Sequence, residues 1–482
     1  MIPRLFLKVA ALTSMVTPMG AGAVAAERVA DGVHVPAHER IVLSNGITLI
    51  IVPDPDVPLV AFNVVLRGGE LGDPAGKPGV ASLVAGLLEK GAGSRNAFQF
   101  ADAVEGVGGS FSAGAGPEAI TIRGQFLARD QPLLLELLAD ALLRPHFDDS
   151  ELGKLRARQI ELIKAAKDSD PSELIGTYGR AFLFHEHPYG RPVIGDESSL
   201  ARITREDVLG YYRGQLGADR LTLVFAGDVD AALLKRSVSR LFSRWPKAAQ
   251  SAPRLAAPAR ATHRRVLLID SPGSVQSYFW IGNVGVDRRY RDRAALDLVN
   301  TLYGGRFTSI LNSELRIKSG LSYGARSGFT RGTVAGEFAI RSFAQTENTG
   351  RAIDLALQTL SGLKRDGVSA PMLDSARAYV LGQYPLEFET AADWAVALGE
   401  LELYHLGLDY IDHYGSELNR VTLGEAQRVI EQAFPGPDAM AIVLIGDAAR
   451  IRAQVRAYGP ITELELTAPT FTAPRTLQRE GS

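Results

Sequence analysis

The sequence of 482 residues contains no cysteine, and it has only eight histidines, five methionines and three tryptophans. Without cysteine there can be no disulfide framework, no thiol nucleophile and no thiolate metal site, so stability must come from the core. A G-x-S-x-G elbow is also missing, so the common serine hydrolase designs have no support. Carboxylates, hydroxyls, arginines and a few histidines remain for any chemistry.

An excess of charge of one sign is absent as well. Lys and Arg number 52 against 54 Asp and Glu, which gives a formal net charge of -2. This balance offers no electrostatic surface for nucleic acid and no polybasic patch for lipid. Hydrophobic residues make up 46% and charged residues 22% of the chain, as in ordinary globular proteins, and the length predicts at least two domains.

Long apolar runs are missing too, and the one near the start is short. Arg4 and Lys8 precede it, and Ala23-Val24-Ala25 fits a signal-peptidase site. A spanning helix needs about 20 apolar residues, so a membrane anchor is the weaker interpretation. We expect residues 1–25 to be a signal peptide, the protein to be periplasmic, and no membrane association after cleavage.

A helix followed by a strand occurs twice with the same features. "RITREDVLGYYRGQLGADRLTLVFAGDVD" and "RVTLGEAQRVIEQAFPGPDAMAIVLIGDAA" each begin with a threonine suited to cap a helix and end in Gly-Asp. Thr204 and Thr422 are 218 residues apart, and Gly227 and Gly446 are 219 apart. Because the register holds at two points, the sequence predicts duplication of a unit of about 220 residues.

Composition places the boundaries between these units. Residues 40–249 and 263–467 alternate strand-like and helix-like patterns, whereas 250–262 is rich in Ala, Pro and Ser without apolar periodicity. We therefore expect an N-terminal domain, a linker and a C-terminal domain in that order. Residues 468–482 are expected to be a loose tail.

Histidines come close together only in "HEHPYG", at His185 and His187. An H-x-H pair on a strand can bind zinc, because both imidazoles then lie on one face. No third ligand of matching spacing is visible in the sequence. We therefore favour a loop-shaping role in a Pro-Gly turn.

The segment "GVASLVAGLLEKG" resembles the active-site helix of the pitrilysin and mitochondrial processing peptidase family, whose zinc peptidases carry G-[LV]-A-H-x-x-E-H. The first zinc histidine of that pattern falls on Ser82, the general-base glutamate on Ala85 and the second histidine on Gly86. The third ligand is a glutamate about 76 residues further along, which falls on Leu162 beside Glu161. The resemblance therefore implies no zinc and no catalysis in this chain alone.

A second motif matches the family where the first does not. "LYGGRFTSILNSELRIKSGLSYGARS" resembles the family's glycine-rich stretch G-G-x-x-S-x-L-x-x-x-L-R-x-x-x-G-L-x-Y. Arg316 and Tyr323 fall on the arginine and tyrosine that contact the substrate backbone near the scissile bond in the family. Gly304 and Gly305 are expected to let the backbone approach substrate or partner closely.

The resemblance covers nearly the whole chain after the leader and implies an α+β fold. Two homologous domains, each a mostly antiparallel sheet backed by helices, would form a clam-like chamber. It further implies a non-catalytic subunit of an exported heterodimeric zinc metallopeptidase, with zinc held by an H-x-x-E-H partner and extended peptides as substrates. The alternative is a binding or assembly protein that kept the peptidase fold without proteolysis.

Overall fold

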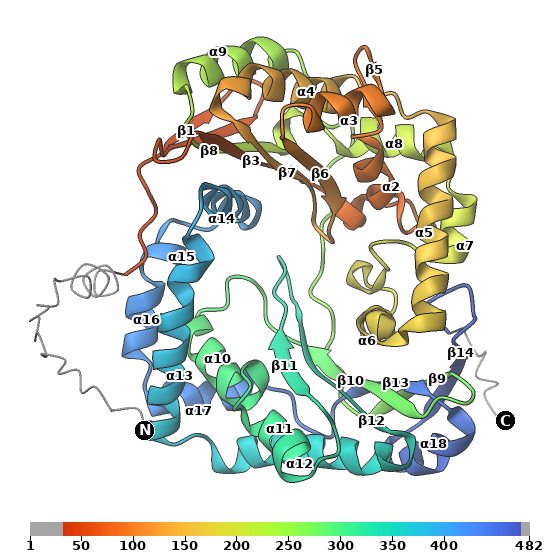
Figure 1. Cartoon of the computed structure of the whole chain (residues 1–482). Coiled ribbons are helices and arrows are strands. Elements are labelled where there is room, and N and C mark those ends of the chain that lie inside the picture. Colours follow the sequence, from red (N-terminus) through yellow and green to blue (C-terminus); the bar gives the residue numbers. More distant parts are fainter. Residues whose placement is uncertain (1–31, 474–482) are drawn as a thin grey trace, which may run out of the picture.

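The computed structural model describes residues 32–473, and the predicted signal peptide lies outside them. Two sheets of six strands each form the framework (Figure 1). The strand order of the first sheet is β1 (Glu39–Val42), β2 (Thr48–Pro53), β8 (Leu221–Gly227), β3 (Leu59–Arg67), β7 (Ala119–Leu127) and β6 (Ser110–Ala115). All of its neighbours are antiparallel except β2 and β8.

The second sheet repeats this order with strands from the other half of the chain. It runs β11 (Ala325–Phe329), β12 (Glu337–Gln345), β10 (Gln276–Val284), β13 (Ala441–Gly446), β9 (Arg265–Asp270) and β14 (Ile461–Glu465). Only β9 has parallel neighbours, on both sides. The place that β1 fills in the first sheet is filled here by β14, near the other end of the chain.

The predicted duplication is confirmed at the residues that suggested it. Thr204 and Thr422 cap α8 (Arg205–Gln215) and α17 (Leu423–Gln432), each through a reciprocal capping box. Gly227 and Gly446 end the equivalent strands β8 and β13. The α+β class and the two homologous, mostly antiparallel sheets backed by helices are therefore as expected.

Helices of each half pack on one face of the sheet from the same half (Figure 1). In the first half these include α2 (Val80–Leu87), α3 (Ala97–Glu105), α4 (Gln131–Leu143), α5 (Asp149–Ser169), α7 (Glu197–Arg202) and α9 (Ala231–Phe242), with α8 beside α2. In the second half they include α10 (Arg293–Asn300), α11 (Ile310–Asn312), α12 (Thr349–Asp366), α13 (Ala370–Gln383), α15 (Asp409–Asp412), α16 (Tyr414–Arg420) and α18 (Ala448–Val455).

One helix from each half crosses to the opposite sheet. α14 (Ala391–Tyr404) packs on β3 and β8, and α6 (Ile175–Phe184) packs on β10 and β13 (Figure 1). Gly399 and Gly179, 220 residues apart, allow the close approach, since a Cβ would lie 2.3 Å from Asn63 Nδ2 and 2.6 Å from Trp280 Cδ2. The halves that the sequence delimits at 40–249 and 263–467 are therefore not separate packing units.

The hydrophobic cores follow from this exchange. Strand β9 alternates sides, so Val266 contributes to the core of the second half and Leu267 to a core shared with the first half. Trp280 and Tyr178 are both fully buried in that shared core. A smaller cluster joins α14 to the outer strands of the first sheet. Burial of apolar area thus stabilises both halves together.

The predicted linker, residues 250–262, contains no helix or strand and is mostly exposed. The first part of the predicted tail differs from the expectation of a loose end. Phe471 is 1% exposed and packs edge-on against Tyr178 at 4.9 Å between ring centroids. Lys167 of α5 donates to the Ala468 carbonyl at 2.6 Å. The apolar ring holds residues 468–471 against the first half because its burial outweighs the entropy of ordering them.

Within residues 32–473, no helix combines the length and the apolarity that crossing a membrane requires.

Candidate functional site

The N-terminus of helix α2 is held by a buried carboxyl group. Asp73 accepts hydrogen bonds from the backbone N–H groups of Gly79 at 2.8 Å and Ala81 at 2.7 Å. Burial raises its pKa to about 7, although the hydrogen bonds from the helix N-terminus lower it. The segment "GDPAGKPG" is therefore a helix cap rather than a phosphate loop.

The first zinc-ligand position is occupied by a hydroxyl that is already bonded. Ser82 Oγ on α2 accepts a hydrogen bond from Gln159 Nε2 on α5 at 3.2 Å. The same amide nitrogen donates to the Ile194 carbonyl. Ser82 and Gln159 therefore satisfy each other, in the place where a metal would need two basic or anionic ligands.

The other two positions on α2 are closed by packing. Ala85 is fully buried. At Gly86 a Cβ atom would lie 2.7 Å from Leu155 Cδ2, so the leucine side chain fills the space that a second histidine would need. Neither a general base nor a second ligand can be accommodated without moving α5.

Leu162 is not the residue that faces this helix, which corrects the assignment made by counting along the sequence. Its side chain is 60% exposed, and neighbouring Glu161 forms an ion pair with Lys164 at 2.9 Å on the surface of α5. Gln159, about one helical turn earlier, is the residue that reaches α2. Among residues 32–473, no three His, Asp or Glu side chains are arranged to hold a metal ion.

The histidine pair of "HEHPYG" shapes a loop, as the sequence favoured. His187 Nδ1 accepts from the Tyr189 backbone N–H at 3.2 Å, and its Nε2 lies 2.9 Å from the Ala256 carbonyl oxygen. Both ring nitrogens are thus engaged. His187 caps the short helical turn η4 (Pro188–Gly190) that follows α6.

Arg316 lies exposed on the π-helical segment η7 (Ser313–Lys318). Its guanidinium carbon is 4.8 Å from the ring centroid of Phe307, which is 61% exposed. In the described part of the chain Arg316 has no carboxylate within ion-pair distance. Its donors are therefore available to another molecule, with the ring holding the guanidinium plane.

Tyr323 is 79% exposed and lies in the loop between η7 and β11. Gly320, at φ 64°, ends the helical segment as predicted, but Tyr323 precedes the strand rather than lying in it. The neighbouring Ser322 anchors the loop, because its hydroxyl donates to the Gly324 carbonyl at 2.9 Å and accepts from Ser342 Oγ at 3.0 Å. The phenol is thus presented on a fixed loop.

The paired glycines serve the packing of the chain itself, at least in part. Gly304 is buried, and a Cβ there would lie 2.3 Å from Ser327 Oγ and 2.5 Å from Ser327 N on β11. Its close backbone approach is therefore internal, which corrects the expectation that it meets substrate or partner. Gly305 is exposed and lines a cavity described below.

Two residues of this region were missed from the sequence. Phe307 lies at a variable position of the glycine-rich motif, and only its exposure reveals its contact with Arg316. Gln159 shares a helix face with Leu152 and Leu155, a period that could have indicated which side of α5 meets α2.

Two models of one peptidase family match the chain in tandem. "Insulinase (Peptidase family M16)" matches residues 49–197, and "Peptidase M16 inactive domain" matches residues 202–380. The chain belongs to the M16 family. With Ser82, Ala85 and Gly86 in place of the H-x-x-E-H residues, it is a non-catalytic member.

Relatives of this M16 chain align over most of its length. An uncharacterized zinc protease of Mycobacterium leprae is 26% identical over 397 residues, 82% of this chain and 88% of the relative. An uncharacterized zinc protease of Bacillus subtilis is 23% identical over 405 residues, 84% of this chain and 98% of the relative.

Solved structures share the fold of both halves. A peptidase M16 inactive domain from Pseudomonas fluorescens superposes with a TM-score of 0.79 at 23% identity, covering 85% of this chain and 98% of that one. A protease from Helicobacter pylori gives a TM-score of 0.77 at 19% identity, with 85% and 99% covered.

Proposed function

We propose that this chain is the substrate-positioning subunit of an exported heterodimeric zinc metallopeptidase that cleaves peptides or small unfolded proteins. Its partner is an M16 chain that carries H-x-x-E-H and the zinc ion. The two chains enclose a chamber, and the leader in residues 1–25 directs the protein to the periplasm.

The observation that carries this proposal is the exposure of the Arg316 and Tyr323 side chains. A tyrosine that is 79% exposed and an arginine without a carboxylate partner contribute little to the fold. Their chemistry suits peptide hydrolysis at a neighbouring metal. A guanidinium offers a fixed fork of donors to peptide carbonyls, and a phenol can donate to the oxyanion that develops at the scissile carbonyl.

Unpaired strand edges add support for binding of extended peptides. β11, which follows Tyr323, is the edge strand of the second sheet, and β6 is the equivalent edge of the first. Both are rich in small residues: "ARSGF" and "SFSAGA". An extended peptide can pair with such an edge through backbone hydrogen bonds, and small side chains do not obstruct it.

The test measures cleavage of quenched fluorescent peptides by this chain alone, by its H-x-x-E-H partner alone and by both together. We expect activity to rise well above that of the partner only in the mixture. Arg316→Ala and Tyr323→Phe should each lower kcat/KM of the mixture, by about 10² for loss of an oxyanion donor. Light scattering should show an unchanged heterodimer.

Matched controls are Arg129→Ala, on an exposed turn of the first half, and Tyr278→Phe, whose hydroxyl has no hydrogen bond within the described residues. Both should leave kcat/KM unchanged. A mixture no more active than the partner alone, or insensitivity to Arg316→Ala and Tyr323→Phe, would favour the binding or assembly protein instead.

A further inference from the structure

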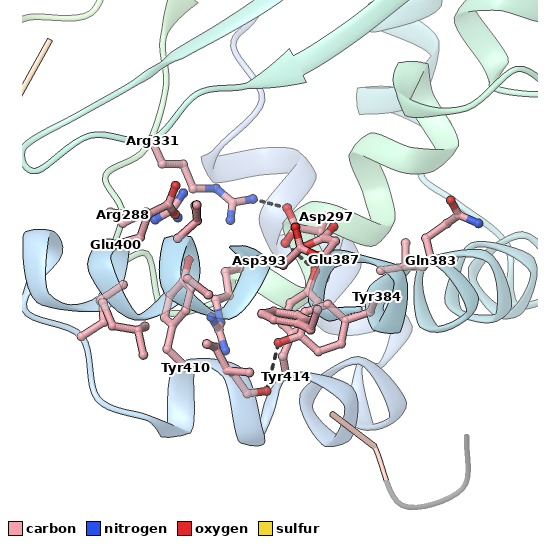
Figure 2. A pocket seen from close by; sticks show the side chains of 18 of the residues that line it. Arg288, Asp297, Arg331, Gln383, Tyr384, Glu387, Asp393, Glu400, Tyr410 and Tyr414 are labelled. Atoms are coloured by element: carbon pink, nitrogen blue, oxygen red, sulfur yellow. Dashed lines mark hydrogen bonds and ion pairs between the residues drawn. The ribbon is translucent and has the colours of Figure 1, made fainter. Parts of the chain in front are cut away.

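A cavity of about 710 Å³ lies in the second half of the chain and reaches across to the first (Figure 2). Helices α10, α13, α14, α15 and α16 contribute to its walls, together with the segment η9 (Tyr384–Phe388) and Arg123 of β7. Its volume is within the range of small-molecule sites, about 300–1,000 Å³. The cavity is separate from α2 and from the surface that carries Arg316 and Tyr323.

Most charged groups of this cavity are neutralised within the protein. Arg331 is paired with Asp297, which also accepts from the Tyr414 hydroxyl at 2.7 Å, and both contacts are drawn in Figure 2. Arg288 binds Glu400 at 2.5 Å. These groups fix the walls of the cavity and leave little net charge for a ligand.

Two further lining groups are already used. Arg293 binds Glu417 at 3.0 Å, and its guanidinium carbon lies 3.5 Å from the ring centroid of Tyr410. Asp393 caps α14 by accepting from the Thr390 backbone N–H at 2.9 Å. Neither is free to bind another molecule.

Arg123 and Glu387 are the two lining groups left without an opposite charge. Within the described residues, neither makes an ion pair, and Glu387 makes no side-chain hydrogen bond. Arg123 uses only its Nε, which donates to Asn63 Oδ1 at 3.3 Å, so both terminal nitrogens are available. Arg123 comes from the first half and Glu387 from the second, and the exchange of α14 brings both to one cavity.

The environment of Glu387 favours a cationic ligand. Burial raises the pKa of its carboxyl group, and the carboxylates of Asp297 and Glu400 raise it further, whereas Arg288 lowers it. A positive group placed beside Glu387 would relieve that unfavourable field. Aromatic rings of Tyr384 and Phe388, 5.1 Å apart and edge-on, form an adjacent wall that suits backbone or side-chain contact.

We propose that this cavity binds short peptides with free ends, the α-ammonium group at Glu387 and the α-carboxylate at Arg123. A planar guanidinium with two free nitrogens matches a carboxylate, and a carboxylate in a partly desolvated site matches an ammonium group. The site belongs to this chain alone and does not depend on a catalytic partner. Its failure would leave the proposed subunit function untouched.

The test is calorimetric titration of the purified chain with dialanine, trialanine and tetraalanine, and with N-acetylated and C-amidated forms of the tightest binder. Each blocked form should bind about tenfold or more weakly, since a charge-assisted contact is lost. Glu387→Gln and Arg123→Gln should weaken the free peptide similarly. Glu387→Gln should also abolish discrimination against acetylation, and Arg123→Gln discrimination against amidation.

Matched controls are Glu389→Gln, two residues from Glu387 and outside the cavity lining, and Arg129→Gln, near the end of β7. Both should bind as the wild type does. The proposal is overturned if the wild-type chain binds none of the peptides, if blocked and free peptides bind equally, or if the controls weaken binding as much as the cavity variants. The blocked peptides test the wild-type protein and so do not depend on variant folding.

Discussion

Gln159 on α5 donates a hydrogen bond to Ser82 Oγ on α2 at 3.2 Å, so an amide and a hydroxyl satisfy each other at the first metal-ligand position of the family. Leu155, about one turn earlier on α5, fills the neighbouring space beside Gly86. The site has therefore been filled and does not merely lack its ligands. A metal could return only if both contacts were removed together.

Restoring a zinc site should accordingly require four changes. We expect Ser82→His, Gly86→His and Gln159→Glu combined with Leu155→Ala to bind one Zn²⁺, because the alanine removes the side chain that a residue at 86 would strike. Calorimetry with Zn²⁺ measures the binding. The matched variant that keeps Leu155 should bind at least tenfold more weakly or fail to fold. Equal affinity of the two would show that Leu155 is no obstacle.

The exchange of helices should depend on a small residue at the crossing. Gly179→Ala places a methyl group 2.6 Å from Trp280 Cδ2, in a fully buried core, and should lower the free energy of unfolding by about 1–3 kcal/mol. Denaturant unfolding checks this value. Gly153→Ala, on α5 with open space around it, should instead stabilise by roughly 0.5–1 kcal/mol. A cost as large at Gly153 would point to backbone effects instead of packing.

The end of the chain should contribute to the stability of the first half. Phe471→Ala removes a ring that is 1% exposed and packs on Tyr178, and should cost about 3–5 kcal/mol of unfolding free energy. Thermal unfolding compares it with Thr467→Ala, an exposed residue just before it. Should both variants unfold at the wild-type temperature, residues 468–471 would have no stabilising role.

Stability should fall as the pH rises above about 5, because of a buried carboxyl group. Glu70 is 1% exposed, and burial together with the nearby Asp73 raises its pKa from 4.5 to about 9. Between these values the folded state keeps a proton that the unfolded state has released, so the free energy of unfolding decreases with pH.

Glu70→Gln, which cannot ionise, should therefore exceed the wild type by about 2 kcal/mol near pH 8.5 and differ little near pH 5. Thermal unfolding at both pH values measures the difference. Glu105→Gln, on an exposed position of α3, serves as the control and should show no pH-dependent gain. A Glu70→Gln variant with an unchanged pH profile would place the effect on another group.

Local signals in the sequence predicted much of this fold, and contacts between distant segments were the part it could not give. The threonine caps at Thr204 and Thr422 depend on three or four neighbouring residues, so they were readable. The crossing of α6 and α14 depends on packing between segments 220 residues apart, and no local pattern encodes it. The third ligand position was misplaced by about one turn, because counting residues does not fix the rotational phase of a helix.

The site followed the same division. Arg316 and Tyr323 could be assigned from a motif, because both lie within one short segment. Phe307 beside Arg316 could not, since exposure of an aromatic ring is a property of the folded surface. The pairing of Arg123 and Glu387 in one cavity was equally hidden, because those residues are brought together only by the exchanged helix.

The reciprocal placement of α6 and α14 is what a domain-swapped homodimer would have if its two chains were joined end to end. Each repeat supplies the helix that the other repeat lacks on its inner face. Neither repeat should then persist as a stable protein by itself. Two separately expressed halves could instead be expected to recover the native state by complementation, as fragments that each complete the other.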